Sequence, residues 1–520
     1  MTQGELALVL HAHLPYVRSA EANSLEGDWY FQALMECYLP LLQTLEHAVE
    51  SNKAQVKLTI GLSPTLLSLL EDNKLKAIFP TWISNRLNLL ELAPKEQKTT
   101  AKYLSRIINK QISYWNKING DLISRFASLH QKEVLDILTC AATHGYLPLL
   151  RETPEAVNAQ LQTAVREHKR LFNQNPLGIW LPECAYYEGL DQLMLAAGLR
   201  YAVLDGHGLL HANPRPRYGI YAPICSKNGV AFFGRDSEST LPVWSAKYGY
   251  PGDESYREFH KDLGWEIPLE ELKRIGISER RPLGLKLHKV TNQNCSLDQK
   301  ETYDPEIASL KAKEHAIKYL SDRKKQLERL NKTMKKSPLL IAPFDAELFG
   351  HWWFEGPVFL SEIFFNANKE EIKLTRLRDV LSSNPKIQLC NPSPSSWGEG
   401  GYHSYWLNEK NSWVVIQWEK ASKELVNYSN ISTLNDFEIR LLKQAAKELL
   451  LVQSSDWSFI LRAGTTTQLA KERISRHLDR FWLLINTIKG EVIIEKSNLK
   501  EIEEEDNLFP LISINDWSRK

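Results

Sequence analysis

Short apolar runs alternate with longer amphipathic segments over most of the first 400 residues. The apolar runs predict strands at Leu6–Leu10, Val56–Ile60, Val134–Ala142, Gly178–Trp180, Tyr201–Leu204, Val230–Phe233, Leu283–Leu287 and Leu339–Ala342, with Ile387–Leu389 as a further candidate. Helical spacing is found over Tyr30–Val49, Ser84–His130, Glu155–Phe172 and Leu190–Ala197. This alternation favours parallel strands joined by right-handed crossovers. Because no G-x-G-x-x-G sequence follows a strand, we expect an α/β barrel rather than a dinucleotide-binding sheet.

Two segments depart from this alternation of predicted strands and helices. The region from about residue 212 to residue 282 is rich in Gly, Pro, Tyr and charged residues, and it is predicted to be a subdomain inserted in the barrel. From residue 396 onward the pattern becomes almost wholly helical. We therefore expect a barrel over residues 1–395 and an all-α C-terminal domain over residues 396–520.

The composition limits the classes of partner. The chain has 64 basic and 63 acidic residues, so neither a nucleic acid nor an anionic membrane surface is indicated. No apolar stretch approaches the roughly 18 residues that a membrane span needs, and a strand pattern begins almost at once, without a signal segment. The six cysteines are scattered, with no C-x-x-C pair. We therefore expect a cytoplasmic protein with reduced thiols.

Two carboxylates follow predicted strands. Asp345 comes just after the apolar run Pro338–Pro343, and Glu183 comes just after the strand Gly178–Trp180. The C-terminal ends of barrel strands converge on one mouth, so the two side chains are expected to meet there. A retaining glycosidase needs such a pair, a nucleophile and an acid/base, about 5–5.5 Å apart. Taken singly, each carboxylate is equally compatible with the first turn of a helix.

Histidines occupy similar positions. His11 and His13 follow the first strand at i and i+2, which directs both rings to one side of an extended backbone, and His144 closes a later strand. His-x-His is also a common metal-ligand spacing, so a metal hydrolase that uses these histidines with Glu183 and Asp345 is an alternative. Against it, the chain contains no H-E-x-x-H sequence. We favour histidines that hydrogen-bond to sugar hydroxyls and to the nucleophile, and a purely structural histidine pair is the remaining alternative.

The chain is rich in aromatic residues, with 15 tryptophans, and many stand beside glycines and carboxylates as in a sugar-binding cleft. The candidate substrate-binding residues, besides the three histidines, are Trp29, Trp265, Trp352, Trp397, Trp406, Trp413 and Asp456. For the tryptophans of the C-terminal part, a place in the core of a helical bundle is the alternative.

These motifs together resemble glycoside hydrolase family 57, and within it the 1,4-α-glucan branching enzymes. The resemblance rests on HAHLP (His11–Pro15), ATHGYLPL (Ala142–Leu149), WLPECAY (Trp180–Tyr186), VWSAKYGYPGD (Val243–Asp253), FDAELFGHWWFEG (Phe344–Gly356), SWGEGG (Ser396–Gly401) and QSSDW (Gln453–Trp457). They occur in the order of the family and span nearly the whole chain.

The resemblance implies a distorted, TIM-like (β/α)7 barrel whose cleft is lined in part by the helical C-terminal domain. It implies that Glu183 is the nucleophile and Asp345 the acid/base of a retaining mechanism, with no cofactor and no metal. The implied substrate is an α-glucan such as amylose, glycogen or a starch-like polymer, and the implied product carries α-1,6 branches. The oligomeric state is left open.

Related activities remain alternatives within the same family, namely α-amylase and 4-α-glucanotransferase. In branching members, transfer is associated with a mobile loop that carries a tyrosine. We expect this loop within Arg235–Asp253, where Tyr248 and Tyr250 are the candidates. A non-catalytic α-glucan-binding protein is the alternative from another class, and the presence of both Glu183 and Asp345 argues against it.

Overall fold

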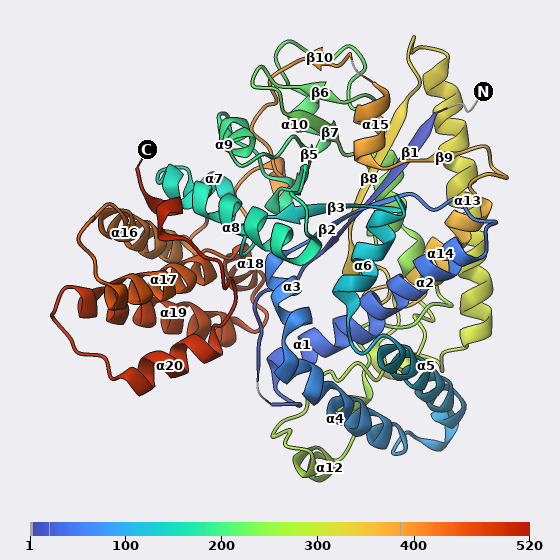
Figure 1. The fold of residues 1–520 in the computed structure, drawn as a ribbon. Helices are drawn as coiled ribbons and strands as arrows, with labels where there is room; N and C mark the ends of the chain where they lie inside the picture. The colour runs from blue at the N-terminus through green and yellow to red at the C-terminus, as the bar shows by residue number, and fades with distance from the viewer. Residues whose placement is uncertain (1–3, 20, 385, 520) are drawn as a thin grey trace.

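A computed structural model describes residues 4–19, 21–384 and 386–519. In this part of the chain, seven parallel strands form a curved sheet in the order β7-β5-β4-β3-β2-β1-β8 (Figure 1). The strands are β1 (Glu5–Ala12), β2 (Leu58–Leu62), β3 (Leu135–Cys140), β4 (Gly178–Trp180), β5 (Tyr201–Leu204), β7 (Ala231–Gly234) and β8 (Leu339–Asp345). Since consecutive strands are neighbours and β8 returns to pair with β1, the predicted α/β barrel is confirmed.

The barrel is distorted where its two ends meet. The sheet path ends at β7 and β8, and the backbone N–H of Asp236, just after β7, donates to the carbonyl of Ile341 in β8 at 2.9 Å. Two short strands extend the sheet beyond β7: β6 (Ile224–Cys225), antiparallel to β7, and β10 (Gln388–Leu389), parallel to β6. A third, β9 (Lys373–Leu374), pairs in parallel with the beginning of β1.

The strands are apolar because both of their faces are covered. Every residue of β2, β3, β4 and β5 is buried, which explains why these strands read as continuous apolar runs without alternation.

The helices of the barrel region are α1 (Leu25–Ala33), α2 (Leu39–Glu50), α3 (Pro64–Glu71), α4 (Asn73–Leu90), α5 (Lys98–Lys117), α6 (Leu122–Gln131), α7 (Leu147–Leu150), α8 (Pro154–Phe172), α9 (Leu190–Ala196), α10 (Gly206–Leu210), α11 (Ser237–Trp244), α12 (Leu269–Arg274), α13 (Pro305–Asn331), α14 (Gly356–Asn366) and α15 (Leu377–Ser383).

The C-terminal part is helical, as predicted. Figure 1 shows its helices gathered on one side of the barrel, next to α7 and α8. They are α16 (Ser412–Ser429), α17 (Asp436–Val452), α18 (Ser455–Ala463), α19 (Thr467–Ile488) and α20 (Lys496–Glu505). The first of them begins at Ser412, so residues 396–411 form a loop whose one helical turn is the short 3-10 segment Glu399–Gly401. The division of the chain at residue 395 stays a prediction.

None of the helices described is both long and apolar enough to cross a membrane.

Two further sequence predictions are corrected by the structure. Leu283–Leu287 is not a strand, because the N–H groups of residues 283, 284 and 285 donate to the buried carboxylate of Asp262 at 2.9–3.1 Å instead of to a neighbouring strand. The segment 212–282 does not lie wholly outside the barrel, because it contains β7.

A π-helical segment, η1 (Leu34–Tyr38), joins α1 to α2. It contacts the loop after β8, where Gly350 adopts φ +123 against the backbone of Glu36. A Cβ atom at residue 350 would lie 1.9 Å from the Glu36 carbonyl oxygen. Only glycine satisfies both the backbone angle and this close approach.

Gly350→Ala is therefore expected to lower the free energy of unfolding by roughly 3–4 kcal/mol, the sum of a left-handed backbone and an overpacked contact. Gly276→Ala is the matched control, because Gly276 also has a positive φ (+84) but a Cβ there would meet nothing within 4 Å. The control is expected to lose only about 1–2 kcal/mol. Denaturant unfolding measures both, and equal losses would contradict the role assigned to the contact with Glu36.

Candidate active site

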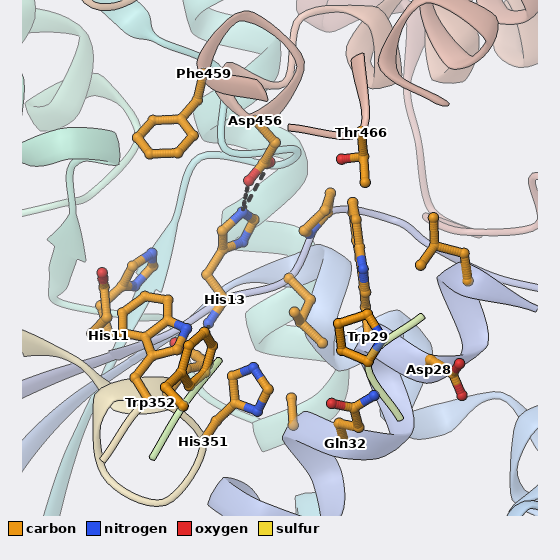
Figure 2. A pocket seen from close by; sticks show the side chains of 18 of the residues that line it. His11, His13, Asp28, Trp29, Gln32, His351, Trp352, Asp456, Phe459 and Thr466 are labelled. Carbon is orange, nitrogen blue, oxygen red and sulfur yellow. Dashed lines mark hydrogen bonds and ion pairs between the residues drawn. The ribbon is translucent and has the colours of Figure 1, made fainter. Parts of the chain in front are cut away.

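A cleft of about 670 Å³ lies at the C-terminal ends of the barrel strands. Ten of the twelve predicted site residues line it: His11, His13, Trp29, His144, Glu183, Trp265, Asp345, Trp352, Trp397 and Asp456. Figure 2 shows Asp456, Phe459 and Thr466 reaching into it from the C-terminal region, opposite Trp352 and His351. The cleft is therefore built jointly by the barrel and the C-terminal helices.

Glu183 lies directly after β4, in a short 3-10 turn that begins at Pro182. Its backbone is left-handed (φ 60), a conformation that costs a non-glycine residue about 1–3 kcal/mol and is typical of functional sites. Its Oε2 accepts a hydrogen bond of 2.7 Å from the Trp397 indole N–H, and its Oε1 accepts one of 3.3 Å from the Ser455 hydroxyl. These donors fix the direction of the carboxylate.

Asp345 is the last residue of β8, in register with His11 of β1. Burial, and after it the neighbouring carboxylate of Glu347, raise the pKa of Asp345 to about 8, although His13 opposes the shift. Burial also raises the pKa of Glu183, to about 7, but the hydrogen bond from Trp397 works in the opposite direction. Near neutral pH, Asp345 is thus the carboxyl group that holds its proton more firmly.

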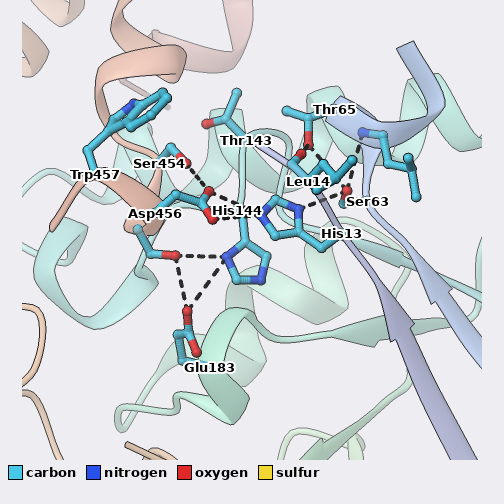
Figure 3. A network of polar contacts seen from close by, with 12 residues as sticks. His13, Leu14, Ser63, Thr65, Thr143, His144, Glu183, Ser454, Asp456 and Trp457 are labelled. Carbon is cyan, nitrogen blue, oxygen red and sulfur yellow. Dashed lines mark hydrogen bonds and ion pairs between the residues drawn. The ribbon is translucent and has the colours of Figure 1, made fainter. Parts of the chain in front are cut away.

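The rings of the three predicted histidines stack on one another. Figure 3 shows two of them, His13 and His144, with Glu183 close to His144. The Nε2 atoms of His11 and His144 are 3.0 Å apart, and the ring of His13 lies 3.9 Å from that of His144. Nδ1 of His144 hydrogen-bonds to Ser455 at 2.8 Å, and Nε2 of His13 hydrogen-bonds to Asp456 at 3.0 Å. Burial lowers the pKa of His11 and of His144, so both rings are neutral at pH 7.

The same cluster tests the metal alternative. Ligand atoms of His13, His144 and Asp456 lie within 4.8 Å of one another, as do those of His11, Cys140 and His144. However, all four ring nitrogens of His13 and His144 already have hydrogen-bond partners. Those of His13 bond to Ser63 and Asp456, and those of His144 bond to His11 and Ser455. A cation there would have to displace these hydrogen bonds, so the donor set fits an orienting network better than a metal centre.

Two predicted substrate-binding residues lie outside the cleft. Trp406 is 1% exposed and stacks on Tyr146 at 4.4 Å, so it supports the wall from behind. Trp413 lies in the first turn of α16 and is not among the residues that line the cleft.

The two candidate tyrosines of the loop Arg235–Asp253 do not line the cleft either. Tyr250 is buried and stacks on His315 at 4.6 Å, whereas Tyr248 is 80% exposed.

The structure adds residues that the sequence analysis did not assign. Glu347 accepts hydrogen bonds from the Tyr38 hydroxyl at 2.5 Å and from the His13 backbone N–H at 3.1 Å. The sequence could have indicated Glu347 as a site residue, because it lies two residues after Asp345 in the same motif. Ser455 touches Glu183 from a distance of 272 residues along the chain, and no local pattern indicates that contact.

Comparison with known proteins gives matches over nearly the whole chain. The model described as glycosyl hydrolase family 57 matches residues 7–391, and that of the 1,4-α-glucan branching enzyme C-terminal region matches residues 417–517. The chain is 32% identical to the 1,4-α-glucan branching enzyme TK1436 of Thermococcus kodakarensis, over 98% of this chain and 77% of that protein.

Two solved structures superpose closely. The α-amylase AmyC of Thermotoga maritima is 34% identical with a TM-score of 0.89, and the alignment covers 99% of both chains. A branching enzyme of the same family from Pyrococcus horikoshii is 30% identical with a TM-score of 0.89, and the alignment covers 100% of this chain and 97% of that one.

Trp397→Phe tests the electrostatics of the site. Without the indole N–H, ionised Glu183 loses a hydrogen bond and its pKa is expected to rise by about one pH unit, which corresponds to about 1.4 kcal/mol. Carboxyl ¹³C NMR titration measures the shift. Trp352→Phe is the control, because Trp352 also lines the cleft but makes no hydrogen bond to Glu183. An unchanged Glu183 pKa in Trp397→Phe would refute the assignment.

Proposed function

The chain belongs to glycoside hydrolase family 57, and we propose that within this family it is a retaining 1,4-α-glucan branching enzyme. The observation that carries the proposal is that the C-terminal helices supply a wall of the cleft. Asp456 on α18 hydrogen-bonds to His13 of the barrel, and Phe459 on the same helix also lines the cleft. The region that matches the branching-enzyme C-terminal model thus takes part in the site itself.

The first half of the reaction cleaves an α-1,4 bond. Asp345, protonated, gives its proton to the glycosidic oxygen while the carboxylate of Glu183 attacks the anomeric carbon. The C–O bond to the leaving chain breaks, and a covalent glycosyl ester forms on Glu183 with inverted configuration. The raised pKa of Asp345, about 8, supports the acid role, and the hydrogen bond from Trp397 supports an ionised Glu183.

The second half transfers the bound chain. Asp345, now a carboxylate, takes the proton of the 6-hydroxyl of another glucan chain, and that oxygen displaces Glu183 from the anomeric carbon. The second inversion restores the α configuration and leaves an α-1,6 branch. Water in place of the 6-hydroxyl would give hydrolysis, so the aromatic rim has to favour a sugar acceptor over water. Trp265 and Trp352, 49% and 43% exposed, offer open ring faces for this purpose.

The three histidines suit a role in shaping the sugar site. The rings of His11 and His144 are neutral, so they add no charge to the cleft. Both ring nitrogens of His13 and of His144 are hydrogen-bonded within the protein, so these two rings act by holding the wall of the cleft in place. The hydrogen bonds to Ser455 and Asp456 orient His144 and His13. We therefore assign His11, His13 and His144 to positioning the sugar and Glu183.

α-Amylase activity is the second candidate, and two observations favour it. AmyC, an α-amylase, superposes over 99% of the chain. In addition, no tyrosine of Arg235–Asp253 lines the cleft in the described structure, so the loop offers no tyrosine gate against water. The chemistry up to the glycosyl ester is the same for both activities, and the acceptor alone distinguishes them.

Incubation with amylose distinguishes the two candidates. A branching enzyme is expected to form new α-1,6 linkages, counted after debranching, in large excess over new reducing ends. Reducing ends without branches would leave an α-amylase.

Glu183→Gln and Asp345→Asn should each lower activity on amylose by roughly 10²–10⁴-fold, because each removes a group that reacts in the transition state. Glu188→Gln is the matched control, since Glu188 is exposed five residues further along the same segment and is expected to keep full activity. A Glu183→Gln enzyme with most of its rate intact would rule out the mechanism.

The pH dependence follows from the two pKa values. Glu183 must be ionised, so kcat/KM should rise as the pH passes about 7, and Asp345 must be protonated, so kcat/KM should fall as the pH passes about 8. With α-maltosyl fluoride, whose fluoride leaves without a proton, Asp345→Asn should still form the glycosyl ester and should lack the alkaline limb. An alkaline limb that persists in this variant would assign it to another group.

A further inference from the structure

The segment between β7 and β8 supplies one wall of the catalytic cleft. The residues that line the cleft from this wall are Phe259, His260, Trp265, Pro282 and Lys286. Figure 2 shows Trp29 and Gln32 of α1 pointing into the same cleft. Of the wall between β7 and β8, only the open ring of Trp265 takes part in the function proposed above. The polar side chains of this region therefore lack an assigned role.

The ammonium group of Lys286 has no polar partner in the protein. Lys286 is the only lysine or arginine among the described residues that line the cleft. The residue is 4% exposed, and its Nζ lies 3.7 Å from the ring centre of Phe259. This Nζ makes no hydrogen bond or ion pair with the described residues, yet it is not among the atoms sealed from solvent. Because a largely desolvated ammonium with open donors is costly, an oxygen acceptor from a ligand or from water is expected beside it.

The nearby carboxylates do not account for the position of Lys286. Glu36 attracts it most strongly, but one oxygen of Glu36 accepts a hydrogen bond from Arg257 and the other accepts one from His351, each at 2.7 Å. Glu36 therefore has a donor on both oxygens without Lys286. A counter-ion role for Lys286 is not needed to satisfy this carboxylate.

Gln32 presents a second open polar group next to Lys286. It is 8% exposed and lines the cleft, and its amide also makes no hydrogen bond with the described residues and is not sealed from solvent. A Cβ atom on Gly284, two residues before Lys286, would lie 3.2 Å from the side chain of Gln32. Two buried residues on different elements thus direct open hydrogen-bonding groups into one part of the cleft.

This pair of groups selects the ligand class. An ammonium donates, and an amide both donates and accepts, so together they match neighbouring hydroxyl groups. An anion fits less well, because the other titratable side chains that line the cleft, apart from histidines, are carboxyl groups: Asp28, Glu183, Asp345, Glu347 and Asp456. The rings of Trp29, Phe259 and Trp265 line the same cleft and offer apolar surface to a sugar ring.

We propose that Lys286 and Gln32 form a subsite for one glucose unit of the bound α-glucan, in which Nζ of Lys286 donates to one hydroxyl oxygen and the Gln32 amide bonds to another. The identity of the sugar rests on the proposed function, whereas the need for hydroxyl groups rests on the two open side chains. A glucose unit held here would set the position of the chain relative to Glu183 and Asp345.

Binding of maltoheptaose tests the proposal. The titrations use the Glu183→Gln protein, in which turnover is blocked. Adding Lys286→Met keeps the length of the side chain but removes its charged donor, so the Kd should rise by roughly 10–100-fold. Adding Gln32→Met removes a neutral partner and should raise the Kd by roughly 2–10-fold. Lys289→Met is the matched control, because Lys289 pairs with Glu301 and does not line the cleft, and it should leave the Kd unchanged.

Each outcome of these titrations has a separate meaning. An unchanged Kd in the Lys286→Met protein would overturn the inference while leaving the proposed function intact. No binding by the parent protein would defeat both, because an α-glucan would then not be the ligand. Hydrolysis of amylose without branching would defeat the branching activity alone, since these Kd values do not depend on the acceptor.

Chemical labelling tests the same contact without altering Lys286. Burial lowers the pKa of Lys286 to about 8, so about half of these side chains are free amines at pH 8. Acetic anhydride at this pH should acetylate Lys286 in the Glu183→Gln protein, as measured by peptide mass spectrometry. Maltoheptaose at ten times its Kd should slow this acetylation by roughly tenfold and leave that of Lys289 unchanged. Failure to label Lys286 in the free protein, or equal labelling with and without maltoheptaose, would overturn the inference.

Discussion

The catalytic geometry depends on the way the loop before α16 holds the end of β4. The Trp397 backbone N–H donates to the Glu183 carbonyl at 3.0 Å, and its indole N–H donates to the Glu183 carboxylate at 2.7 Å. Tyr186, three residues after Glu183, and Ser395, two residues before Trp397, form an antiparallel bridge. These contacts offset the cost of the left-handed backbone at Glu183. They also tie the direction of the carboxylate to a segment more than 200 residues away.

The two carboxyl groups differ in the groups that surround them in the buried cleft. Both have lost water, which raises both pKa values, but their other neighbours differ. Glu183 receives hydrogen bonds that favour its ionised form, whereas Asp345 lies near a further carboxylate, Glu347. In the mechanism we propose, these different surroundings keep Glu183 ready to attack and Asp345 ready to give a proton. Glu347 is itself held by Tyr38 on η1, so the electrostatics of the site extend into the helix layer.

That helix layer lines the catalytic cleft and also a second cavity, of about 450 Å³, which shares no lining residue with the cleft. The continuous segment of α1, η1 and α2 presents Trp29 and Gln32 to the catalytic cleft and Glu36, Gln43 and Thr44 to the second cavity. A π-helical turn at this point shifts the register between the two halves of the segment, and such turns are frequent at functional sites.

The sequence predicted the parts of this protein that are encoded locally. A run of buried residues marks a strand wherever both faces of the sheet are covered, so all seven barrel strands and the strand-end positions of Glu183, Asp345, His11 and His144 could be inferred. Local patterns failed where a distant group replaced the expected partner. Leu283–Leu287 has the composition of a strand, but the carboxylate of Asp262 takes the hydrogen bonds that a neighbouring strand would have received.

Tertiary structure decided which of the chemically similar residues line the cleft. Trp397 and Trp406 lie in one motif, yet one faces Glu183 and the other packs behind Tyr146. Other hydrogen bonds form only when separate elements pack together. They are those of Ser455 to Glu183, of the His13 N–H to Glu347, and of the Arg257 N–H to Glu355. The sequence by itself determined the barrel and its pair of carboxylates, because periodicity and strand ends are local properties. The solvation of each carboxylate, and hence its role, is a property of the packed cleft and was decided by the tertiary structure.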